Sequence, residues 1–305
     1  MTTLVLRRAS LRPGQEGDLV LADGRVQVGP ADAALVGGAD VDVIDLAGRP
    51  VVPGLVDHHL HLLALAAAWD SVDLSPTALQ EGGGLDAVLQ GARRRQPQGW
   101  LRGVGYDVAA SGPLDAARLA RTGTGPLRIQ DRTGIQWVLD PIALAEVLPT
   151  DPAAWPSGVD LDVDGRPSGV LVRLDAWLRG RWPEGPPDVA AVGRWLAERG
   201  VTSVTDAGAA NGPVELALLA GAGLDQHVTA MTRDAQVEPV PGIALGPVKV
   251  LLDDADLPAL DDLSARIEAA HRVGRTVAVH CVTEVQLVLA LAAGLDQHVT
   301  AMTRD

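Results

Sequence analysis

Residues 51–63 read VVPGLVDHHLHLL, an apolar run that ends in three histidines within four positions. The chain has seven histidines, and none lies between His61 and His227. A nearly continuous apolar run of this kind is typical of a strand covered on both faces in a parallel sheet. The stretch therefore predicts a buried parallel strand whose C-terminal end carries imidazoles.

Alternation along a strand sorts these side chains into two groups. Residues two apart point to the same side, so Asp57, His59 and His61 share a face, and His58 points away, packed or toward solvent. Two imidazoles about 6–7 Å apart along a strand can chelate one divalent ion. Two ordinary polar side chains leaving a sheet would show the same pattern, so the pair alone leaves both interpretations open.

Two later strands carry further candidates. His280 closes the apolar run TVAVH (276–280), and active sites of parallel sheets gather at such strand ends. Lys249, the single lysine of the chain, lies inside the apolar run PVKVLL (247–252). Burying an ammonium is costly, so the lysine either extends its head to solvent or is held neutral and modified. Arginine cannot do the latter, because its guanidinium stays protonated.

The rest of the chain divides into three parts. Residues 17–29 and 41–46 predict a hairpin turning at Asp23-Gly24 and one more strand, which gives a small β portion over 1–50. Residues 51–305 form the main domain, interrupted at about 75–187 by an irregular insertion with short strands at 100–107 and 126–134. After the insertion, helical and strand patterns alternate. Helices are predicted at 191–200, 214–223, 263–274 and 284–294, and strands at 201–208, 227–232, 246–254 and 276–281. Such βα units imply a parallel sheet, either a barrel or a doubly wound layer.

Composition excludes several classes of function. The net charge of −14 argues against a nucleic-acid partner, and Arg93-Arg94-Arg95 is most simply a solvated helix face. No apolar run is long enough for a signal peptide or a membrane span. A single cysteine, Cys281, excludes a disulfide framework, and we expect a cytoplasmic protein.

One segment occurs twice. AGLDQHVTAMTRD stands at 222–234 and again at 293–305, identical at every position. Ancient structural repeats drift and are similar over the whole unit, so a recent duplication or a joining of sequences explains the copy better than architecture does. We interpret His298 as a copy of His227.

The motif VVPGLVDHHLHL resembles the strand-one signature of the amidohydrolase superfamily. The segments GWLRGVGYD, GRPSGVL, GVTSVTDAG, GPVKVLLDD and VAVH are similar, in the same order, to its branch with a large insertion after strand one, which includes N-substituted formamide deformylase-like enzymes. This resemblance implies a (β/α)8 barrel with an N-terminal β-sandwich portion. It also implies a metal site, most compatible with one or two zinc ions, whose ligands are His59, His61, Lys249 as a carbamate, and His280.

The implied activity is hydrolysis of a small-molecule amide or formamide by metal-activated water. The family pattern also places a histidine on strand six and a catalytic aspartate on strand eight, and neither can be identified here. Residues 51–74 and 190–305 amount to about 140, whereas a full barrel takes about 250, so we expect an incomplete barrel. The alternatives are an inactive remnant and a related metal-dependent deaminase. Asp131 and Trp137 could line a pocket or simply pack, and Asp206 could support a metal ligand or cap a helix.

Overall fold

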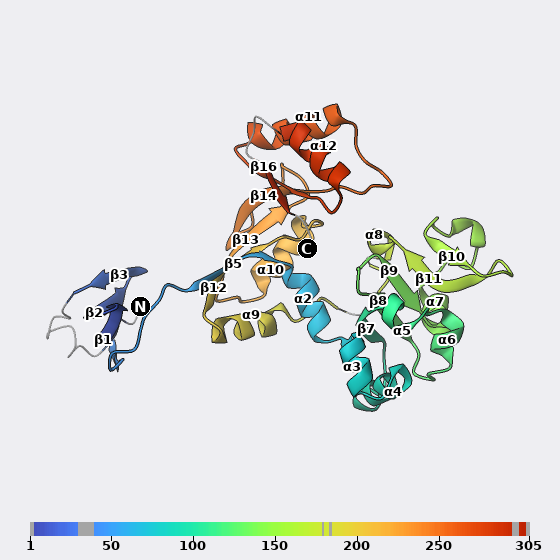
Figure 1. The fold of residues 1–305 in the computed structure, drawn as a ribbon, viewed down its shortest axis with the longest axis horizontal. Coiled ribbons are helices and arrows are strands. Elements are labelled where there is room, and N and C mark those ends of the chain that lie inside the picture. The colour runs from blue at the N-terminus through green and yellow to red at the C-terminus, as the bar shows by residue number, and fades with distance from the viewer. Residues whose placement is uncertain (1–2, 30–39, 179, 183–184, 295–298, 303–305) are drawn as a thin grey trace. The chain divides into compact units, whose positions relative to one another are not determined.

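The computed structural model describes residues 3–29, 40–178, 180–182, 185–294 and 299–302. The chain divides into two units, Met1–Leu55 and Val56–Asp305. Among the described residues, none of the helices has both the length and the apolar character needed to cross a membrane. Figure 1 shows the elements of each unit, labelled where there is room.

The first unit contains the N-terminal sheet, with strand order β3-β2-β1-β4. Its strands are β1 (Thr3–Arg12), β2 (Gln15–Ala22), β3 (Arg25–Val28) and β4 (Val41–Asp45). The predicted hairpin is confirmed, because β2 and β3 pair antiparallel around Asp23 and Gly24, both at positive φ. The described residues of this unit form one sheet, and its central strand β1 was not among the predicted strands.

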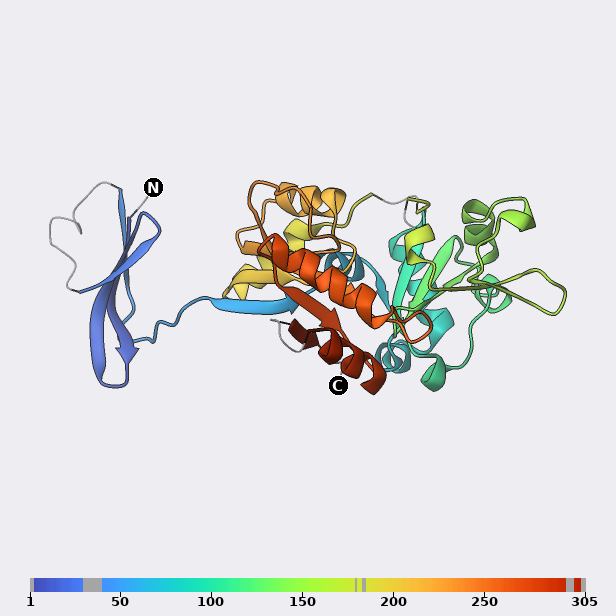
Figure 2. The ribbon, with the colours of Figure 1, turned by 90° about the horizontal axis from the view of Figure 1, so that it is seen from above.

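The second unit contains the barrel sheet, a curled parallel sheet with strand order β16-β15-β14-β13-β12-β5 (Figures 1 and 2). Its strands are β5 (Leu55–Leu60), β12 (Val201–Asp206), β13 (His227–Thr232), β14 (Ile243–Leu251), β15 (Val277–His280) and β16 (Val299–Met302). Strand order follows chain order, which is the order of a barrel rather than of a doubly wound layer. The predicted strands after the insertion are confirmed. The second copy of the repeated segment adds β16, which pairs in register with β15.

The helices of this part pack on one face of the barrel sheet. They are α2 (Leu62–Trp69), α9 (Val189–Glu198), α10 (Pro213–Gly221), α11 (Leu260–Arg272) and α12 (Glu284–Gly294). Two apolar cores lie under them, one against β12 and β13 and the other against β14 and β15. Because Val248 and Val250 belong to the second core, the residue between them must face the opposite, inner side of the curl.

Strand β5 differs from the prediction of a strand covered on both faces. It lies at an edge of the barrel sheet, and Val56 is 48% exposed. An apolar run alone does not distinguish a central strand from an edge strand, since both contact at least one packed neighbour.

The insertion is more regular than its sequence suggests. Between α2 and α9 it forms the insertion sheet, a mixed sheet with strand order β10-β11-β9-β8-β7-β6. Its strands are β6 (Val72–Asp73), β7 (Leu101–Tyr106), β8 (Leu127–Asp131), β9 (Gln136–Leu139), β10 (Val159–Leu161) and β11 (Pro167–Val172). Its helices are α3 (Pro76–Glu81), α4 (Leu85–Arg95), α5 (Val108–Ser111), α6 (Ala116–Ala120), α7 (Pro141–Val147) and α8 (Asp175–Leu178), with a short 3-10 turn at Pro152–Ala154. Two apolar cores hold it together.

The expectation that all three arginines at the end of α4 are solvated is wrong for Arg93. Its guanidinium donates hydrogen bonds to the carbonyl oxygens of Gly99 and Gly125 at 2.8 and 3.1 Å, and also to those of Gln96 and Pro126. Arg94 and Arg95 are exposed, as predicted. One arginine of this charged run therefore links the loop after α4 to the loop before β8 by hydrogen bonds.

Candidate functional site

The histidine pair lies where β5 passes into α2. His59 belongs to the strand, and His61 is the residue immediately before the helix. Their ring centroids are 5.3 Å apart with the ring planes at 73°, so the two imidazoles meet edge to face. The backbone amide of His59 donates to the Asp57 carboxylate at 3.0 Å, which fixes the local strand geometry. Both rings are exposed, so a ligand from solvent can reach them.

Lys249 lies on the inner face of the barrel sheet. Its side chain is only 2% exposed and is the largest of the fully buried ones among the described residues. Its register partner on β15 is Ala278, which packs with Ala207 and Met231 in a small apolar cluster. Burial lowers the pKa of the Lys249 amine, because desolvation penalises its charged form. The neutral amine is thus favoured here more than in water.

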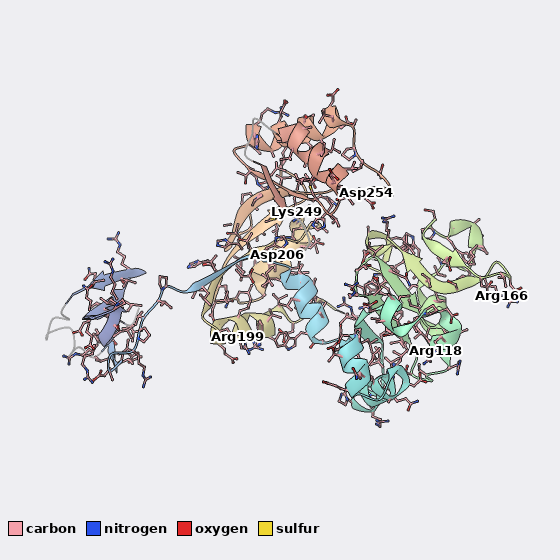
Figure 3. All side chains as sticks on the ribbon, in the orientation of Figure 1. Arg118, Arg166, Arg199, Asp206, Lys249 and Asp254 are labelled. Carbon is pink, nitrogen blue, oxygen red and sulfur yellow. The ribbon has the colours of Figure 1, made fainter. Side chains whose placement is uncertain are left out.

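His59 and Lys249 influence each other electrostatically. Partial burial lowers the pKa of the His59 imidazole, and the positive charge of Lys249 lowers it further. The carboxylates of Asp57 and Asp206 act in the opposite direction. Strands β5 and β14 are separated by two others in the sheet, so its curl must carry their inner faces toward each other. Figure 3 labels Asp206 and Lys249 on the curled sheet.

His280 shares the inner face with Lys249. Lys249 pairs with Ala278, and Leu251 pairs with His280, on adjacent parallel strands in register. Side chains that are two residues apart, or paired across parallel strands, point to the same side of a sheet. Within the described ranges, however, no three His, Cys, Asp or Glu side chains lie close enough to hold an ion together. His280 therefore faces the site without completing a cluster of such groups.

Asp206 connects the histidine segment to the sheet. Its carboxylate, 1% exposed, accepts hydrogen bonds from the Leu62 amide at 2.7 Å and the Gly208 amide at 3.3 Å. Nδ2 of the buried Asn211 donates to the same carboxylate and to the carbonyl oxygen of Met231 on β13. Since Leu62 is the first residue of α2, Asp206 caps this helix from β12, a strand that is far from it in the sequence. Both interpretations offered for Asp206 in the sequence are thus compatible with one arrangement.

Asn211 is part of this network although no sequence pattern marks it. It lies in the loop after β12, where a polar residue gives no signal of burial.

Asp131 and Trp137, the two insertion residues that could line a pocket, differ in their surroundings. Asp131 accepts hydrogen bonds from the amides of Thr133 and Gln136 and so stabilises its own turn. Trp137 lines a cavity.

The donor set fits a divalent metal ion in its chemistry. Imidazole nitrogens are good ligands for zinc and related ions, and His59 and His61 present two of them side by side. A lysine can bind a metal only after it loses its proton or is converted to a carbamate, and burial of Lys249 favours the first of these conditions. These residues could therefore hold a metal ion on the inner face of the sheet.

Sequence comparisons identify relatives over most of the chain. A model described as "Amidohydrolase family" matches residues 42–304. Over 186 residues the chain is 27% identical to an N-substituted formamide deformylase of Arthrobacter pascens, an alignment that covers 52% of this chain and 31% of the deformylase. A 61-residue stretch is 48% identical to an imidazolonepropionase of Symbiobacterium thermophilum and covers 19% of this chain and 14% of that protein. The aligned parts thus span less than a third of either relative.

Solved structures show a similar fold. An uncharacterized metal-dependent hydrolase from Pyrococcus horikoshii matches with a TM-score of 0.69 and 20% identity, over 96% of this chain and 68% of that one. Another from Pyrococcus furiosus matches with a TM-score of 0.66 and 20% identity, over 95% and 69% of the two chains. At this level of identity the likeness concerns the fold alone.

Proposed function

Since this chain belongs to the amidohydrolase family, we propose that it is a metal-dependent hydrolase of non-peptide carbon–nitrogen bonds in small amides or formamides. The observation that carries the proposal is the His59–His61 pair, with ring centroids 5.3 Å apart, in the same sheet as the buried Lys249, whose charge acts on His59. The similarity to a protein named for its action on N-substituted formamides supports the type of bond.

The proposed ligands are His59, His61, Lys249 and His280. His59 and His61 would bind as neutral imidazoles. The ammonium of Lys249 would first lose one proton, and the neutral amine would then react with carbon dioxide to form a carbamate and release a second proton, which gives an anionic oxygen ligand. The apolar surroundings of Lys249 favour the neutral amine that this reaction needs. His280 faces the same side of the sheet and would supply a further nitrogen.

A bound divalent ion such as zinc would supply a polarising charge for the amide oxygen and a water of lowered pKa. The chain's own residues set the surroundings. Ala207, Met231 and Ala278 make the inner face apolar, which strengthens polar interactions there by lowering the local dielectric. Asp206 and Asn211 hold the start of α2, and with it His61, against β12 and β13. The site would therefore be held rigid by residues that do not touch the ion.

The test is metal content and hydrolysis measured on the same samples. The purified chain is incubated with zinc, freed of excess ion, and assayed for metal and for release of formate from N-substituted formamides. We expect about one or two ions per chain. His59→Ala and His61→Ala should each lose metal and activity. His58→Ala is the matched control, because His58 is the neighbouring histidine on the other face of β5.

The outcomes separate the alternatives. A chain that binds no zinc when folded, or whose zinc is unaffected by His59→Ala, would contradict the metal site. Bound zinc without hydrolysis of formamides or other amides would contradict the activity and favour an inactive relative. Release of ammonia from nitrogen heterocycles in place of formamide hydrolysis would favour a deaminase.

A further inference from the structure

Gln286 is a buried polar side chain in the first turn of α12, and it is only 4% exposed. Its amide group forms hydrogen bonds in two directions. Oε1 accepts from the Val282 amide at 2.6 Å, and Nε2 donates to the Asp254 carboxylate at 2.8 Å. Val282 follows β15, whereas Asp254 follows β14. One buried side chain therefore joins the loops at the C-terminal ends of these two strands.

Part of this arrangement is an ordinary helix cap. Thr283 directly precedes α12, and its hydroxyl accepts a hydrogen bond from the Gln286 backbone amide at 3.3 Å. Oε1 of Gln286 in turn accepts from the Thr283 amide at 3.4 Å. This reciprocal pattern is a capping box, in which glutamate serves at the second position as well as glutamine does. The cap accounts for Oε1 but not for Nε2.

The bond from Nε2 to Asp254 requires a glutamine at position 286. An ionised carboxylate only accepts hydrogen bonds, whereas an amide side chain also donates them. The same oxygen of Asp254 accepts from the Thr283 hydroxyl at 2.9 Å, so two donors at the start of α12 meet at one carboxylate oxygen. Hydrogen bonds to an ionised group are stronger than those between neutral groups. The start of α12 is thereby attached to the loop after β14.

The two joined loops follow the strands that carry two of the proposed ligands. His280 is the last residue of β15, two positions before Val282. Lys249 lies in β14, five positions before Asp254 (Figure 3). Beyond the strands, the Leu252 amide still donates to the His280 carbonyl oxygen, at 3.4 Å. The link between the loops thus acts at the edge where parallel barrels place their active sites.

We propose that Gln286 and Asp254 are positioning residues of the metal site, an inference that rests on the proposed function. Neither residue touches the ion. The hydrogen bond between them holds the loops after β14 and β15 against each other, and so keeps Lys249 and His280 at a constant separation. Residues that orient metal ligands in this way commonly change metal affinity by about tenfold to hundredfold when they are replaced.

Two substitutions separate this role from helix capping. Gln286→Glu keeps the acceptor that caps α12 but places a second carboxylate opposite Asp254. Asp254→Asn keeps an acceptor for Nε2, and in the double variant the asparagine amide donates to the new carboxylate. We expect zinc to bind about tenfold more weakly to Gln286→Glu, whereas Asp254→Asn and the double variant should stay within about twofold of the native chain.

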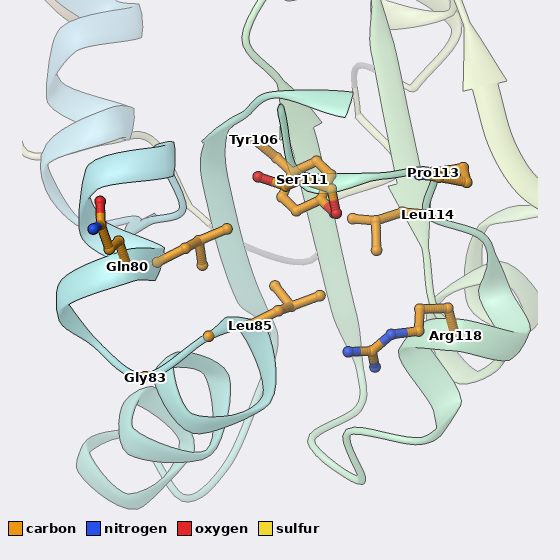
Figure 4. Close-up of a pocket in the computed structure, with 10 residues that line it drawn as sticks. Gln80, Gly83, Leu85, Tyr106, Ser111, Pro113, Leu114 and Arg118 are labelled. Atoms are coloured by element: carbon orange, nitrogen blue, oxygen red, sulfur yellow. The ribbon is translucent and has the colours of Figure 1, made fainter. Parts of the chain in front are cut away.

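Zinc affinity is measured on the full chain by competition with a chelator, with bicarbonate present and at about pH 8, where carboxylates are ionised. Hydrogen exchange on zinc-free samples is the second readout, and the amides of residues 252–256 should exchange faster in Gln286→Glu. Gln80→Glu is the matched control. Gln80 lines a cavity of about 470 Å³ whose described lining residues all belong to the insertion (Figure 4). This control should leave both readouts unchanged.

The outcomes separate this inference from the proposed function. A native chain that binds no zinc would overturn both. Native zinc affinity in Gln286→Glu, in a protein whose zinc is lost in His59→Ala, would overturn the positioning role alone. Failure of Asp254→Asn to restore the affinity of Gln286→Glu would also contradict it, because the defect would then not come from their hydrogen bond. Should Gln286→Glu fail to fold, Asp254→Ala decides, since Asp254 is exposed and lies outside the cap, and it should weaken zinc binding equally.

Discussion

The Asp206 carboxylate accepts a hydrogen bond at 2.7 Å from the Leu62 amide, 144 positions away in the chain. Leu62 begins α2, directly after His61, so this bond connects the histidine segment to the second strand of the barrel sheet. The carboxylate satisfies an amide at the helix start that has no partner within the helix itself. One buried side chain thereby fixes where the strand-one histidines end and the helix begins.

Replacing Asp206 by alanine should strongly destabilise the second unit. The change leaves the Leu62 and Gly208 amides and the Asn211 side chain without this acceptor, which should lower the free energy of unfolding by about 3 kcal/mol. Urea unfolding measures the loss. Glu268→Ala is the control: it removes an exposed ion pair with Arg272 and should change stability by less than about 1 kcal/mol. Equal effects of the two changes would contradict the role of Asp206.

The ionisation of Lys249 should make stability depend on pH. Burial lowers its pKa in the folded chain below the ordinary value of 10.5. Between these two values the unfolded chain binds one more proton than the folded chain, so the stability of the native protein rises with pH in that window. Lys249→Met removes this dependence.

We therefore expect Lys249→Met to be more stable than the native chain at neutral pH, with a difference that narrows as pH approaches 10.5. Urea unfolding from neutral pH to about pH 10, in buffer free of carbon dioxide so that no carbamate forms, measures this difference. A difference that stays constant across the range would show that the buried amine does not titrate as inferred.

Arg93 should stabilise the insertion more than its neighbour Arg94 does. Arg93→Ala removes hydrogen bonds to the carbonyl oxygens of Gly99, Gly125 and two further residues, with an expected cost of about 2 kcal/mol. Hydrogen exchange of the loops around residues 96–100 and 123–127 should become faster. Arg94→Ala is the matched control, because Arg94 is exposed on the same helix turn. Similar exchange in both variants would rule out this function of Arg93.

Two glycines of the insertion with positive φ should differ in their tolerance of a methyl group. A Cβ at Gly169, where φ is +100°, would meet the Ala116 nitrogen at 2.6 Å and the Leu139 oxygen at 2.8 Å. Gly165, with φ at +75°, has no atom within 4 Å of such a Cβ. Gly165→Ala should cost about 1 kcal/mol from backbone strain, and Gly169→Ala about 2 kcal/mol more from the clash. Thermal unfolding of the two variants gives the comparison, and equal losses would contradict the packing at Gly169.

Local patterns in the sequence were sufficient to predict the helices and strands whose apolar residues recur at a regular spacing. The alternation and turn at 17–29 predicted the first hairpin, and the βα pattern after residue 187 predicted the strands and helices that carry Lys249 and His280. The alternation of side chains along the strand also predicted that His59 and His61 share one face. Each of these inferences depends on residues a few positions apart, because the repeat of a helix or strand fixes the relative directions of nearby side chains.

Contacts between distant segments were decided only by the tertiary structure. The strands predicted at 100–107 and 126–134 are present as β7 and β8. The order of the strands in the insertion sheet, the exposed edge position of β5 and the pairing of Arg102 with Arg128 do not follow from a local period. The hydrogen bond from Leu62 to Asp206 requires that β12 lie beside β5, and the electrostatic effect of Lys249 on His59 requires the curl of the barrel sheet. The pattern of a strand indicates which of its faces is buried, but not which strand lies beside it. Pairing joins segments that are far apart in the sequence, so it depends on the fold of the whole sheet.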